Sequence, residues 1–306
     1  MMQRAVWRTS RRDLEIGRRP LVMGILNFTP DSFSDGGRFV SPGQQLTTSE
    51  TLDLAVETAS KMQADGADLI DIGGESTRPY SDPVDAEIET ERVVPVIERL
   101  ANHLAIPISI DTSKASVANA AIQAGAEIVN DVSGLEGDPE MPAVVVKTRV
   151  GVCVMHMKGT PQTMQDDPSY RDVVDEIERY LLARRQACLD QGIEPERICL
   201  DPGIGFGKTH DHNLTLLRAT HRFASIGSPI LIGHSRKGFI RKVLDRNERG
   251  LNDEYNPMAG TLAVSMAVAA AGAHVIRVHD VAETVQGLDL FEASGGLAVS
   301  TDNRAF

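Results

Sequence analysis

Two stretches of the sequence place residues that could do chemistry directly after short apolar segments. Asp201-Pro-Gly-Ile-Gly-Phe-Gly-Lys208 follows the segment 198–200, and Gly233-His-Ser-Arg-Lys-Gly-Phe239 follows the segment 229–232. A carboxylate on one glycine-rich stretch and a Ser-Arg-Lys cluster on the other offer acceptors, donors and positive charge. A packed core needs none of these groups, so we interpret both stretches as parts of a functional site at strand ends.

Polar residues recur in this position along the chain. They lie at the ends of eight strand-like segments. These residues are Asn27, Asp71, Asp111, Asn130-Asp131, His156, Asp201, Ser235-Arg-Lys237 and Arg277 with His279. Any one of them could simply mark the end of a strand, and we interpret Asp71, Asp131 and His156 in this way. The set as a whole indicates a site, because it places carboxylates and carboxamides opposite several cations.

The set divides into two kinds of chemistry. Asp111, Asn130 and Asp201 suit a flat heterocycle with several N–H donors, because buried polar groups are normally hydrogen-bonded. Arg78, Arg277 and His279, with the amide of Asn27, form a cationic end suited to phosphate oxygens. The same end suits a pyrophosphate held with Mg²⁺, which takes few protein ligands. The residues alone therefore indicate group transfer from a diphosphate-bearing heterocycle.

The elements that must position these residues alternate between two periodicities. Strand-like segments are predicted at 21–26, 69–72, 107–110, 127–129, 151–155, 198–200, 229–232 and 274–278. Amphipathic helical patterns are predicted between them at 51–62, 90–101, 113–124, 172–190, 213–223, 260–271 and 281–293. Eight strands in alternation with helical patterns predict a single α/β domain, a (β/α)8 TIM barrel, whose mouth collects the strand-end residues. A doubly wound sheet is the alternative, but no glycine-rich nucleotide fingerprint follows the first strand.

The ends of the chain are predicted to lie outside the barrel. Alternation around Val6-Trp7-Arg8 and Leu14-Glu15-Ile16 predicts a short hairpin within residues 1–20. The barrel would then occupy residues 21–295, and residues 296–306 would form a tail. The linking segments 29–49 and 73–85 are long for a barrel, and long loops on one face often carry function.

Composition excludes several classes of protein. The chain has 306 residues, 42% of them hydrophobic and only 4% aromatic, which predicts an aliphatic core. A net charge of −12 argues against a nucleic-acid partner. No apolar segment reaches membrane-spanning length, and the arginine-rich start lacks the apolar region of an export signal. We therefore expect a cytoplasmic protein, with its three cysteines in the reduced state.

Seven motifs in order resemble the dihydropteroate synthase family, from Val22 to about Glu292. They are Met23-Gly-Ile-Leu-Asn-Phe-Thr-Pro-Asp-Ser-Phe-Ser-Asp-Gly-Gly37, Ile70-Asp-Ile-Gly-Gly-Glu-Ser-Thr-Arg-Pro79, Ser109-Ile-Asp-Thr112, Ile128-Val-Asn-Asp-Val-Ser133, Met155-His-Met-Lys-Gly-Thr-Pro161, Asp201–Lys208, and Ser235-Arg-Lys237 with Arg277-Val-His279. The resemblance implies condensation of 6-hydroxymethyl-7,8-dihydropterin diphosphate with 4-aminobenzoate in folate biosynthesis. It also implies a homodimer and a site that sulfonamides target.

The resemblance implies a role for each matching residue. The pterin would be held by Asp111, Asn130, Asp201, Lys237 and Met155. The diphosphate would be held by Asn27 acting through Mg²⁺, and by Thr77, Arg78, Arg277 and His279. The aminobenzoate pocket would be shaped by Phe33, Pro79, Phe206 and Ser235. Lys237, Asp35 and Phe33 would serve catalysis, the last two from the first loop.

An SN1-like loss of pyrophosphate fits this set of residues. Cations and Mg²⁺ would take up the charge of the leaving group, and the remaining methylene cation is delocalised into the pterin. The nucleophile is a neutral arylamine, so no strong base is needed. Two features depart from the family pattern, namely His234 beside the Ser-Arg-Lys cluster and a longer segment at 38–49.

Two alternative functions remain open on the sequence. A methyltetrahydrofolate:corrinoid methyltransferase would share the pterin acceptors but would not need Arg277, His279 or the Ser-Arg-Lys cluster. A catalytically silent pterin-binding paralogue would be expected to lose Phe33, Asp35, Arg78, Lys237 or Arg277, and this chain retains them. Both observations favour the synthase.

Overall fold

The structure is a computed structural model, and it describes residues 5–28, 48–245 and 256–297. The chain begins with an antiparallel hairpin of β1 (Ala5–Arg8) and β2 (Asp13–Ile16), in which Trp7 pairs with Leu14. This hairpin confirms the alternation seen in the sequence. Trp7 is fully buried although its strand has only four residues, so one face of the hairpin packs against the body of the protein.

Eight parallel strands follow and close into a barrel. They are β3 (Leu21–Asn27), β4 (Leu69–Gly73), β5 (Ile108–Asp111), β6 (Ile128–Asp131), β7 (Gly151–Met155), β8 (Ile198–Asp201), β9 (Leu231–Ile232) and β10 (Val275–Val278). Their order in the sheet is β8-β7-β6-β5-β4-β3-β10-β9. A parallel bridge between Leu200 and Ile230 joins the two end strands, which closes the sheet. The predicted (β/α)8 barrel is therefore confirmed.

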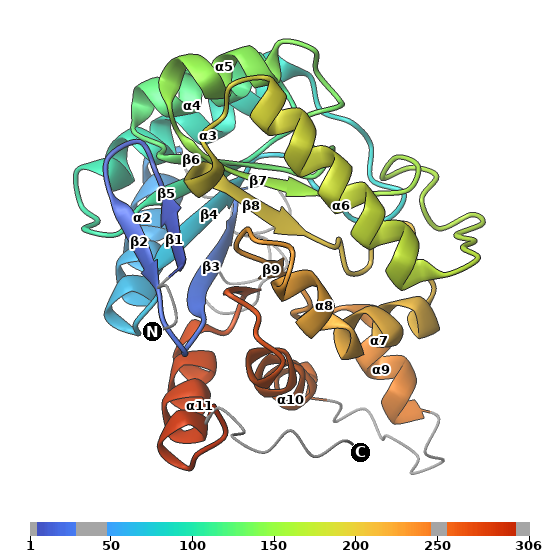
Figure 1. The fold of residues 1–306 in the computed structure, drawn as a ribbon. Coiled ribbons are helices and arrows are strands. Elements are labelled where there is room, and N and C mark those ends of the chain that lie inside the picture. The colour runs from blue at the N-terminus through green and yellow to red at the C-terminus, as the bar shows by residue number, and fades with distance from the viewer. Residues whose placement is uncertain (1–4, 29–47, 246–255, 298–306) are drawn as a thin grey trace.

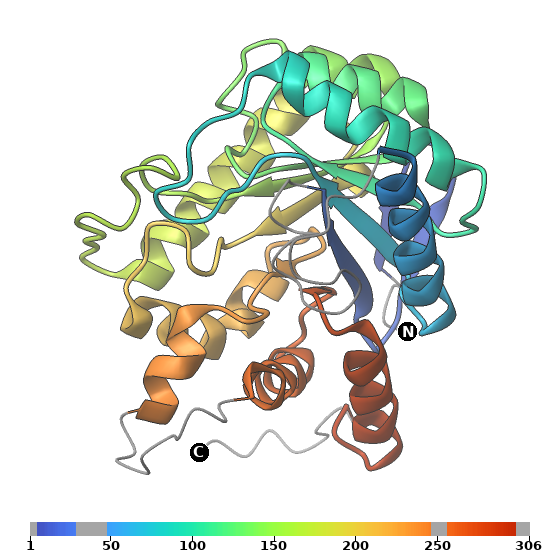
Figure 2. The same cartoon turned by 180° about the vertical axis from the view of Figure 1, so that it is seen from behind.

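Helices surround the barrel on all sides in both views (Figure 1 and Figure 2). They are α2 (Thr48–Ala64), α3 (Ala86–Ala101), α4 (Ala115–Ala124), α5 (Met141–Thr148), α6 (Val173–Asp190), the 3-10 turn η1 (Pro195–Arg197), α7 (His210–Arg218), α8 (Thr220–Ala224), α9 (Gly238–Asp245), α10 (Pro257–Ala270) and α11 (Val281–Ala293). Together the longer helices cover the outer face of the sheet, so the parallel strands are buried on both faces.

The sequence patterns predicted most of these helices and missed two. The pattern at 213–223 predicted one helix, but the chain turns at Ala219 and forms α7 and α8. The reason is local, because the buried Thr220 hydroxyl donates to the Leu217 carbonyl and interrupts the helical bonding there. The short helices α5 and α9 were not predicted, since eight residues give too little periodicity to recognise.

Alternation along the strands divides their side chains into an outer and an inner set. Ile70, Ile72 and their equivalents on the other strands pack outward against the helices. The inward set forms a separate apolar cluster of Trp7, Ile16, Leu21, Met23, Leu69, Ile128, Cys153, Cys199, Leu231 and Val275. Two residues further along β4, β6, β7, β8 and β10, the inward positions are Asp71, Asn130, Met155, Asp201 and Arg277. Strand periodicity therefore places a site directly above an apolar layer.

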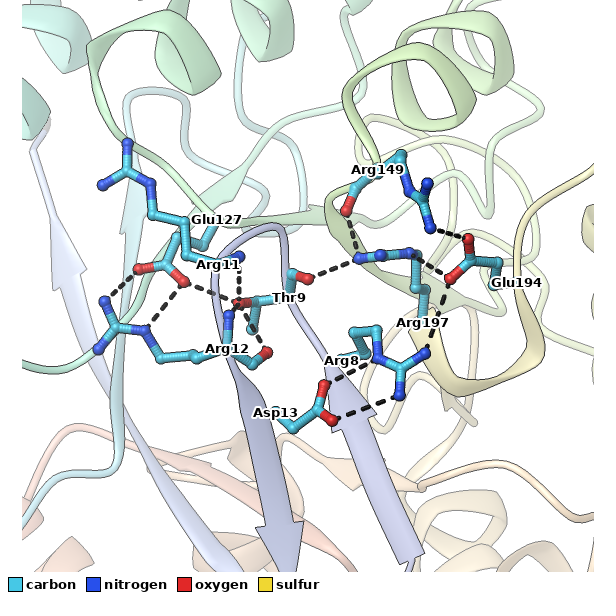
Figure 3. Close-up of polar contacts among 9 residues, drawn as sticks. All are labelled: Arg8, Thr9, Arg11, Arg12, Asp13, Glu127, Arg149, Glu194 and Arg197. Atoms are coloured by element: carbon cyan, nitrogen blue, oxygen red, sulfur yellow. Dashed lines mark hydrogen bonds and ion pairs between the residues drawn. The ribbon is translucent and has the colours of Figure 1, made fainter.

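The hairpin covers the end of the barrel at which the strands begin, which we call the bottom. The Trp7 indole donates to the Arg197 carbonyl over 3.1 Å. Glu127 precedes β6, and its carboxylate accepts from Arg12 Nη2 at 2.7 Å and from Thr9 Oγ1 at 2.7 Å. Figure 3 shows this network running from Glu127 across the hairpin turn to Arg197. The bottom is thus closed by paired polar groups around a buried indole.

Candidate active site

A cluster of four side chains occupies the opposite end, the mouth of the barrel. Arg277 on β10 donates from Nε to Asp71 Oδ2 at 2.6 Å and from Nη2 to Asp111 Oδ2 at 2.9 Å. Asn130 on β6 donates to the same Asp71 oxygen at 3.0 Å. Asp71 therefore connects the predicted diphosphate residue Arg277 to the predicted pterin residue Asn130, and Arg277 itself contacts the predicted pterin residue Asp111.

Two oxygens of this cluster have no internal partner. Asp71 Oδ1 and Asp111 Oδ1 are buried, and neither accepts a hydrogen bond from the described residues. Burial raises the pKa of Asp111 to about 7, and the neighbouring Arg277 only partly opposes this shift. Buried acceptors without partners are costly in a folded protein, so a donor-rich ligand at the mouth would stabilise them.

Asp201 and Lys237 form a second group on the same mouth. Asp201 ends β8, and its Oδ1 accepts from the Gly203 amide at 2.6 Å. Burial raises the pKa of Asp201, whereas the positive charge of Lys237 opposes the shift. Lys237 donates to the Ile204 carbonyl and lies 4.6 Å from the centre of the Phe206 ring. Burial lowers the pKa of Lys237 to about 8, so its ammonium is poised near neutral pH.

The loop after β9 is fixed by contacts to its neighbours. Ser235 Oγ lies 2.9 Å from His279 Nδ1 and also accepts from the His279 amide at 3.3 Å. Arg236 has a positive φ of 58°, and its guanidinium pairs with Asp280. His234 is fully buried, with its Nε2 3.0 Å from Ser265 Oγ on α10. The unusual histidine is therefore a packing contact between this loop and α10.

The charge of the predicted diphosphate end comes from its arginines. Burial lowers the pKa of His279 to about 3, and the positive charges of Arg236, Arg277 and Arg78 contribute to the shift. His279 is consequently neutral at pH 7 and can offer a hydrogen bond rather than a charge. In the free protein the positive charge of this end therefore resides on its arginines, because burial disfavours the imidazolium.

The loop between β4 and α3 carries the other predicted diphosphate residues. Thr77 is half-buried, and Arg78 and Pro79 are exposed at the rim. The Tyr80 amide donates to the Pro161 carbonyl at 3.0 Å, and Gln162 donates to the Ser81 carbonyl at 2.9 Å. These two bonds join this loop to the one that follows β7. Arg78 is thereby held near His279, whose pKa it influences.

The remaining predicted residues fall into three groups. Met155 is buried at the end of β7, and Phe206 is half-buried on the loop after β8. Asn27 ends β3. Phe33 and Asp35, and most of the segment 38–49, lie outside the described residues. The described site therefore contains the predicted pterin and diphosphate groups and part of the predicted aminobenzoate pocket.

Sequence reasoning set aside two residues that belong to this end of the barrel. Asp71 was interpreted as a strand end, yet it is fully buried and bonds both Arg277 and Asn130. His156 was interpreted in the same way, yet its ring contacts Lys208 Nζ at 3.0 Å. The signal for Asp71 was available, because it alternates with Leu69, which points into the barrel. No equivalent signal existed for the partner of His156.

The described part of the mouth offers separate oxygen donors rather than a cluster of metal-binding side chains. Within the described part of the chain, no three His, Cys, Asp or Glu side chains are grouped so that they could hold a metal ion. Oxygens of Asn27 and Asp111 nevertheless face the same point beside Gly73, where an added Cβ would lie 3.7 Å from Asn27 Oδ1 and 3.8 Å from Asp111 Oδ2. Oxygen donors that are few in number fit Mg²⁺, which keeps several waters and bonds phosphates.

Comparison with known proteins assigns the family. Residues 23–279 match the family described as pterin binding enzyme. Dihydropteroate synthase from Synechocystis is 45% identical over 88% of this chain and 88% of its own. The chain belongs to the dihydropteroate synthase family. This result confirms the resemblance carried by the seven motifs, and it weighs against a corrinoid methyltransferase.

Solved structures agree with this assignment. Xanthomonas albilineans dihydropteroate synthase with 4-aminobenzoic acid has a TM-score of 0.83 and 41% identity, covering 97% of this chain and 100% of that one. The same bacterium's dihydropteroate synthase in complex with 7,8-dihydropteroate has a TM-score of 0.79 and 40% identity, covering 96% and 99%. The likeness therefore extends over the whole barrel, including the strand ends that form the mouth.

Proposed function

We propose that this protein condenses 6-hydroxymethyl-7,8-dihydropterin diphosphate with 4-aminobenzoate to give 7,8-dihydropteroate and pyrophosphate. The observation that carries the proposal is the contact of Arg277 with both Asp71 and Asp111 in a chain of this family. It sets a guanidinium suited to phosphate beside carboxylates suited to a heterocycle. Relatives with 4-aminobenzoic acid or 7,8-dihydropteroate in their structures support both substrate classes.

The pterin would bind to the hydrogen-bond acceptors deepest in the mouth. Asp111 and Asp201 would accept from its ring N–H groups, and Asn130 would donate to or accept from the same edge. Met155 would pack against one face of the ring, because its buried and flexible side chain adapts to flat surfaces. Lys237 would reach the pterin from the loop after β9. These roles rest on the resemblance and on the positions of the side chains in the mouth.

The diphosphate would lie between the loop after β4 and the end of β10. Arg78, Arg277, Thr77 and the neutral His279 would hold its oxygens by charge and hydrogen bonds. Asn27 would hold Mg²⁺ through its amide oxygen. When bound, the ion would neutralise charge that develops on the departing pyrophosphate. Arg277, fixed in advance by Asp71 and Asp111, would need little rearrangement during the SN1-like departure.

The aminobenzoate would bind at the rim. Phe206, Pro79 and Ser235 would shape the described part of its pocket, and Phe33 and Asp35 would act from the first loop. The amine can attack without a base, because it carries a neutral lone pair. Loops that exclude water would protect the methylene cation from hydrolysis.

The first test is pyrophosphate release by the purified protein with the pterin diphosphate and Mg²⁺, with and without 4-aminobenzoate. We expect release coupled to formation of dihydropteroate, with a loss of activity in Lys237→Ala. The control is Lys147→Ala, because Lys147 is exposed on α5, outside the mouth. Tight pterin binding without any pyrophosphate release would refute the enzymatic proposal and favour a silent paralogue.

We also expect a homodimer. The family resemblance implies an interface near the last helices, and α10 presents Ala259, Ala263 and Ala267 as exposed residues at four-residue spacing. Small side chains in one row allow two helices to approach closely. Sedimentation velocity on wild type and Ala263→Arg would test this expectation, with a shift to monomer in the variant supporting it.

As to membranes, no helix in the described residues is long and apolar enough to cross one.

A further inference from the structure

A buried lysine lies beneath the loop that follows β8. Lys208 is only 2% exposed, and the roles described above do not use it. Its Nζ lies 2.7 Å from the Phe206 carbonyl, 3.0 Å from His156 Nδ1 and 3.3 Å from the His156 carbonyl. An ammonium group has three N–H donors. Lys208 therefore has one acceptor for each of its donors.

These acceptors connect two elements of the mouth. His156 follows Met155 at the end of β7, and its amide donates to the Asp201 carbonyl at 3.0 Å. Phe206 belongs to the loop 202–207, which lies against the end of β7. Gly203 permits this close approach, because a Cβ at its φ of 70° would lie 1.9 Å from the His156 carbonyl oxygen. Lys208 thus bonds the backbone on both sides of this contact.

The electrostatics support a directed interaction. Burial lowers the pKa of His156 to about 3, so the ring is neutral and one of its nitrogens can accept a hydrogen bond. Burial also lowers the pKa of Lys208, while Asp201 opposes the shift and Lys237 adds to it. The Tyr180 ring packs edge-on against His156, with centroids 4.7 Å apart, and restrains the imidazole. The acceptor is therefore fixed by packing.

A buried ammonium is poorly explained by stability alone. Apolar side chains of similar size often replace buried charges without loss of stability, because desolvation of the charge is costly. The loop also has other anchors, since Gln165 donates to the Gly205 carbonyl and Tyr170 to the Gly207 carbonyl. What Lys208 adds is control of one carbonyl, that of Phe206, whose ring faces Lys237.

We propose that Lys208, together with His156, is a positioning residue for the aminobenzoate side of the site. Lys208 holds the Phe206 carbonyl, and Lys237 holds the Ile204 carbonyl two residues earlier. The two lysines together fix the direction of the Phe206 ring at the rim. The inference rests on the proposed function, because it assigns a substrate to that ring.

The main test compares Lys208→Met with Lys147→Met in steady-state kinetics. Methionine has a similar length and cannot donate. We expect the KM for 4-aminobenzoate to rise about tenfold in Lys208→Met, the size expected for one buried carbonyl left unpaired. The KM for the pterin diphosphate should stay within about twofold. Lys147→Met should match wild type in all of these.

A matched pair at His156 tests the acceptor independently. His156→Asn keeps a polar atom near the position of Nδ1, and His156→Leu has the same shape without an acceptor. Both variants lose the ring contact with Tyr180 equally. We expect the aminobenzoate KM to rise in the leucine variant and to be largely retained in the asparagine variant. An equal KM for 4-aminobenzoate in the two variants would overturn the proposal. This pair tests the proposal by itself if Lys208→Met does not fold.

Hydrogen exchange of residues 202–207 gives a readout that does not depend on activity. Exchange should be faster in Lys208→Met than in wild type or Lys147→Met, because the Phe206 carbonyl is released. An aminobenzoate KM within twofold of wild type, or equal rises in both KM values, would refute the inference. A wild type that releases no pyrophosphate would refute the proposed function instead, and exchange at 202–207 would then decide on Lys208 by itself.

Discussion

The two ends of this barrel use similar charged residues in opposite ways. At the bottom, the Glu127 carboxylate accepts from Arg12 through both of its oxygens and from Thr9 through one of them. At the mouth, Asp71 and Asp111 each leave one buried oxygen without a partner among the described residues. The Glu127 carboxylate is satisfied within the chain, whereas the two carboxylates at the mouth have hydrogen-bonding capacity left for a ligand. Burial of a charge therefore does not by itself reveal a site, and the unpaired oxygens of Asp71 and Asp111 count because both belong to one cluster at the mouth.

Replacing Arg277 is the strongest test of whether the charged cluster at the mouth serves activity rather than stability. Arg277→Met removes the donors to Asp71 and Asp111 as well as a charge near the diphosphate. We expect kcat/KM for the pterin diphosphate to fall about 10³-fold, the size seen when a preorganised donor to developing charge is removed. Pyrophosphate release measures the effect. Activity within tenfold of wild type would mean that the Asp71–Arg277–Asp111 contact is structural, as at the bottom.

Arg12 provides the opposite case. Arg12→Met leaves the buried Glu127 carboxylate with Thr9 as its remaining side-chain partner. We expect the free energy of unfolding to fall by about 2 kcal/mol, since Arg12 is partly exposed and the full cost of breaking a buried pair does not apply. The value of kcat/KM should stay within about twofold.

Urea unfolding measures this change, and Arg11→Met is its control. Arg11 is exposed on the same turn, so its replacement should change stability by less than about 0.5 kcal/mol. A loss of activity in Arg12→Met at unchanged stability would contradict the assignment of the bottom to folding.

Lys237 makes the activity of the mouth depend on pH. Its pKa of about 8 is set by burial, which lowers it, with Asp201 opposing and Arg277 adding to the shift. The ammonium is charged below this pH and neutral above it. We therefore expect kcat/KM for the pterin diphosphate to fall about tenfold per unit above about pH 8, and to fall also below about pH 7, where Asp111 takes up a proton and can no longer accept as a carboxylate.

A rate profile in a mixed buffer of constant ionic strength checks this expectation. Lys237→Arg is the informative variant, because arginine keeps its charge throughout the range. Its residual activity should lack the alkaline fall. A fall that persists in Lys237→Arg would have to come from another group.

The sequence predicted the barrel, its hairpin and most of the mouth, and the misses have physical causes. Strand-end residues such as Asp111, Asn130 and Asp201 were recognisable because parallel strands bring their ends to one face. The role of Asp71 depends on Arg277, which lies 206 residues away in sequence and meets it through barrel closure. Lys208 meets His156 only because a glycine loop folds back onto β7. Local patterns predict elements, but they do not predict which distant side chains meet.

Ser235 gives the finest test of the difference between the two ends. Its Oγ contacts His279 Nδ1 at 2.9 Å and so restrains the angle of a neutral ring at the predicted diphosphate end. Ser235→Ala should lower kcat/KM for the pterin diphosphate only about fivefold, because one neutral hydrogen bond contributes about 1 kcal/mol.

Ser228 is the matched control, since it is equally buried and accepts from Arg185 Nε at 2.9 Å just before β9, at the bottom end. Ser228→Ala should reduce stability by a similar free energy and leave kcat/KM unchanged. Both serines are 5% exposed, and each contacts one side chain that can carry a proton. A different response to the same deletion would therefore come from the end of the barrel each serine occupies. If both variants lost stability but kept the kcat/KM of wild type, His279 would be a packing residue and the diphosphate would have to be held by the arginines.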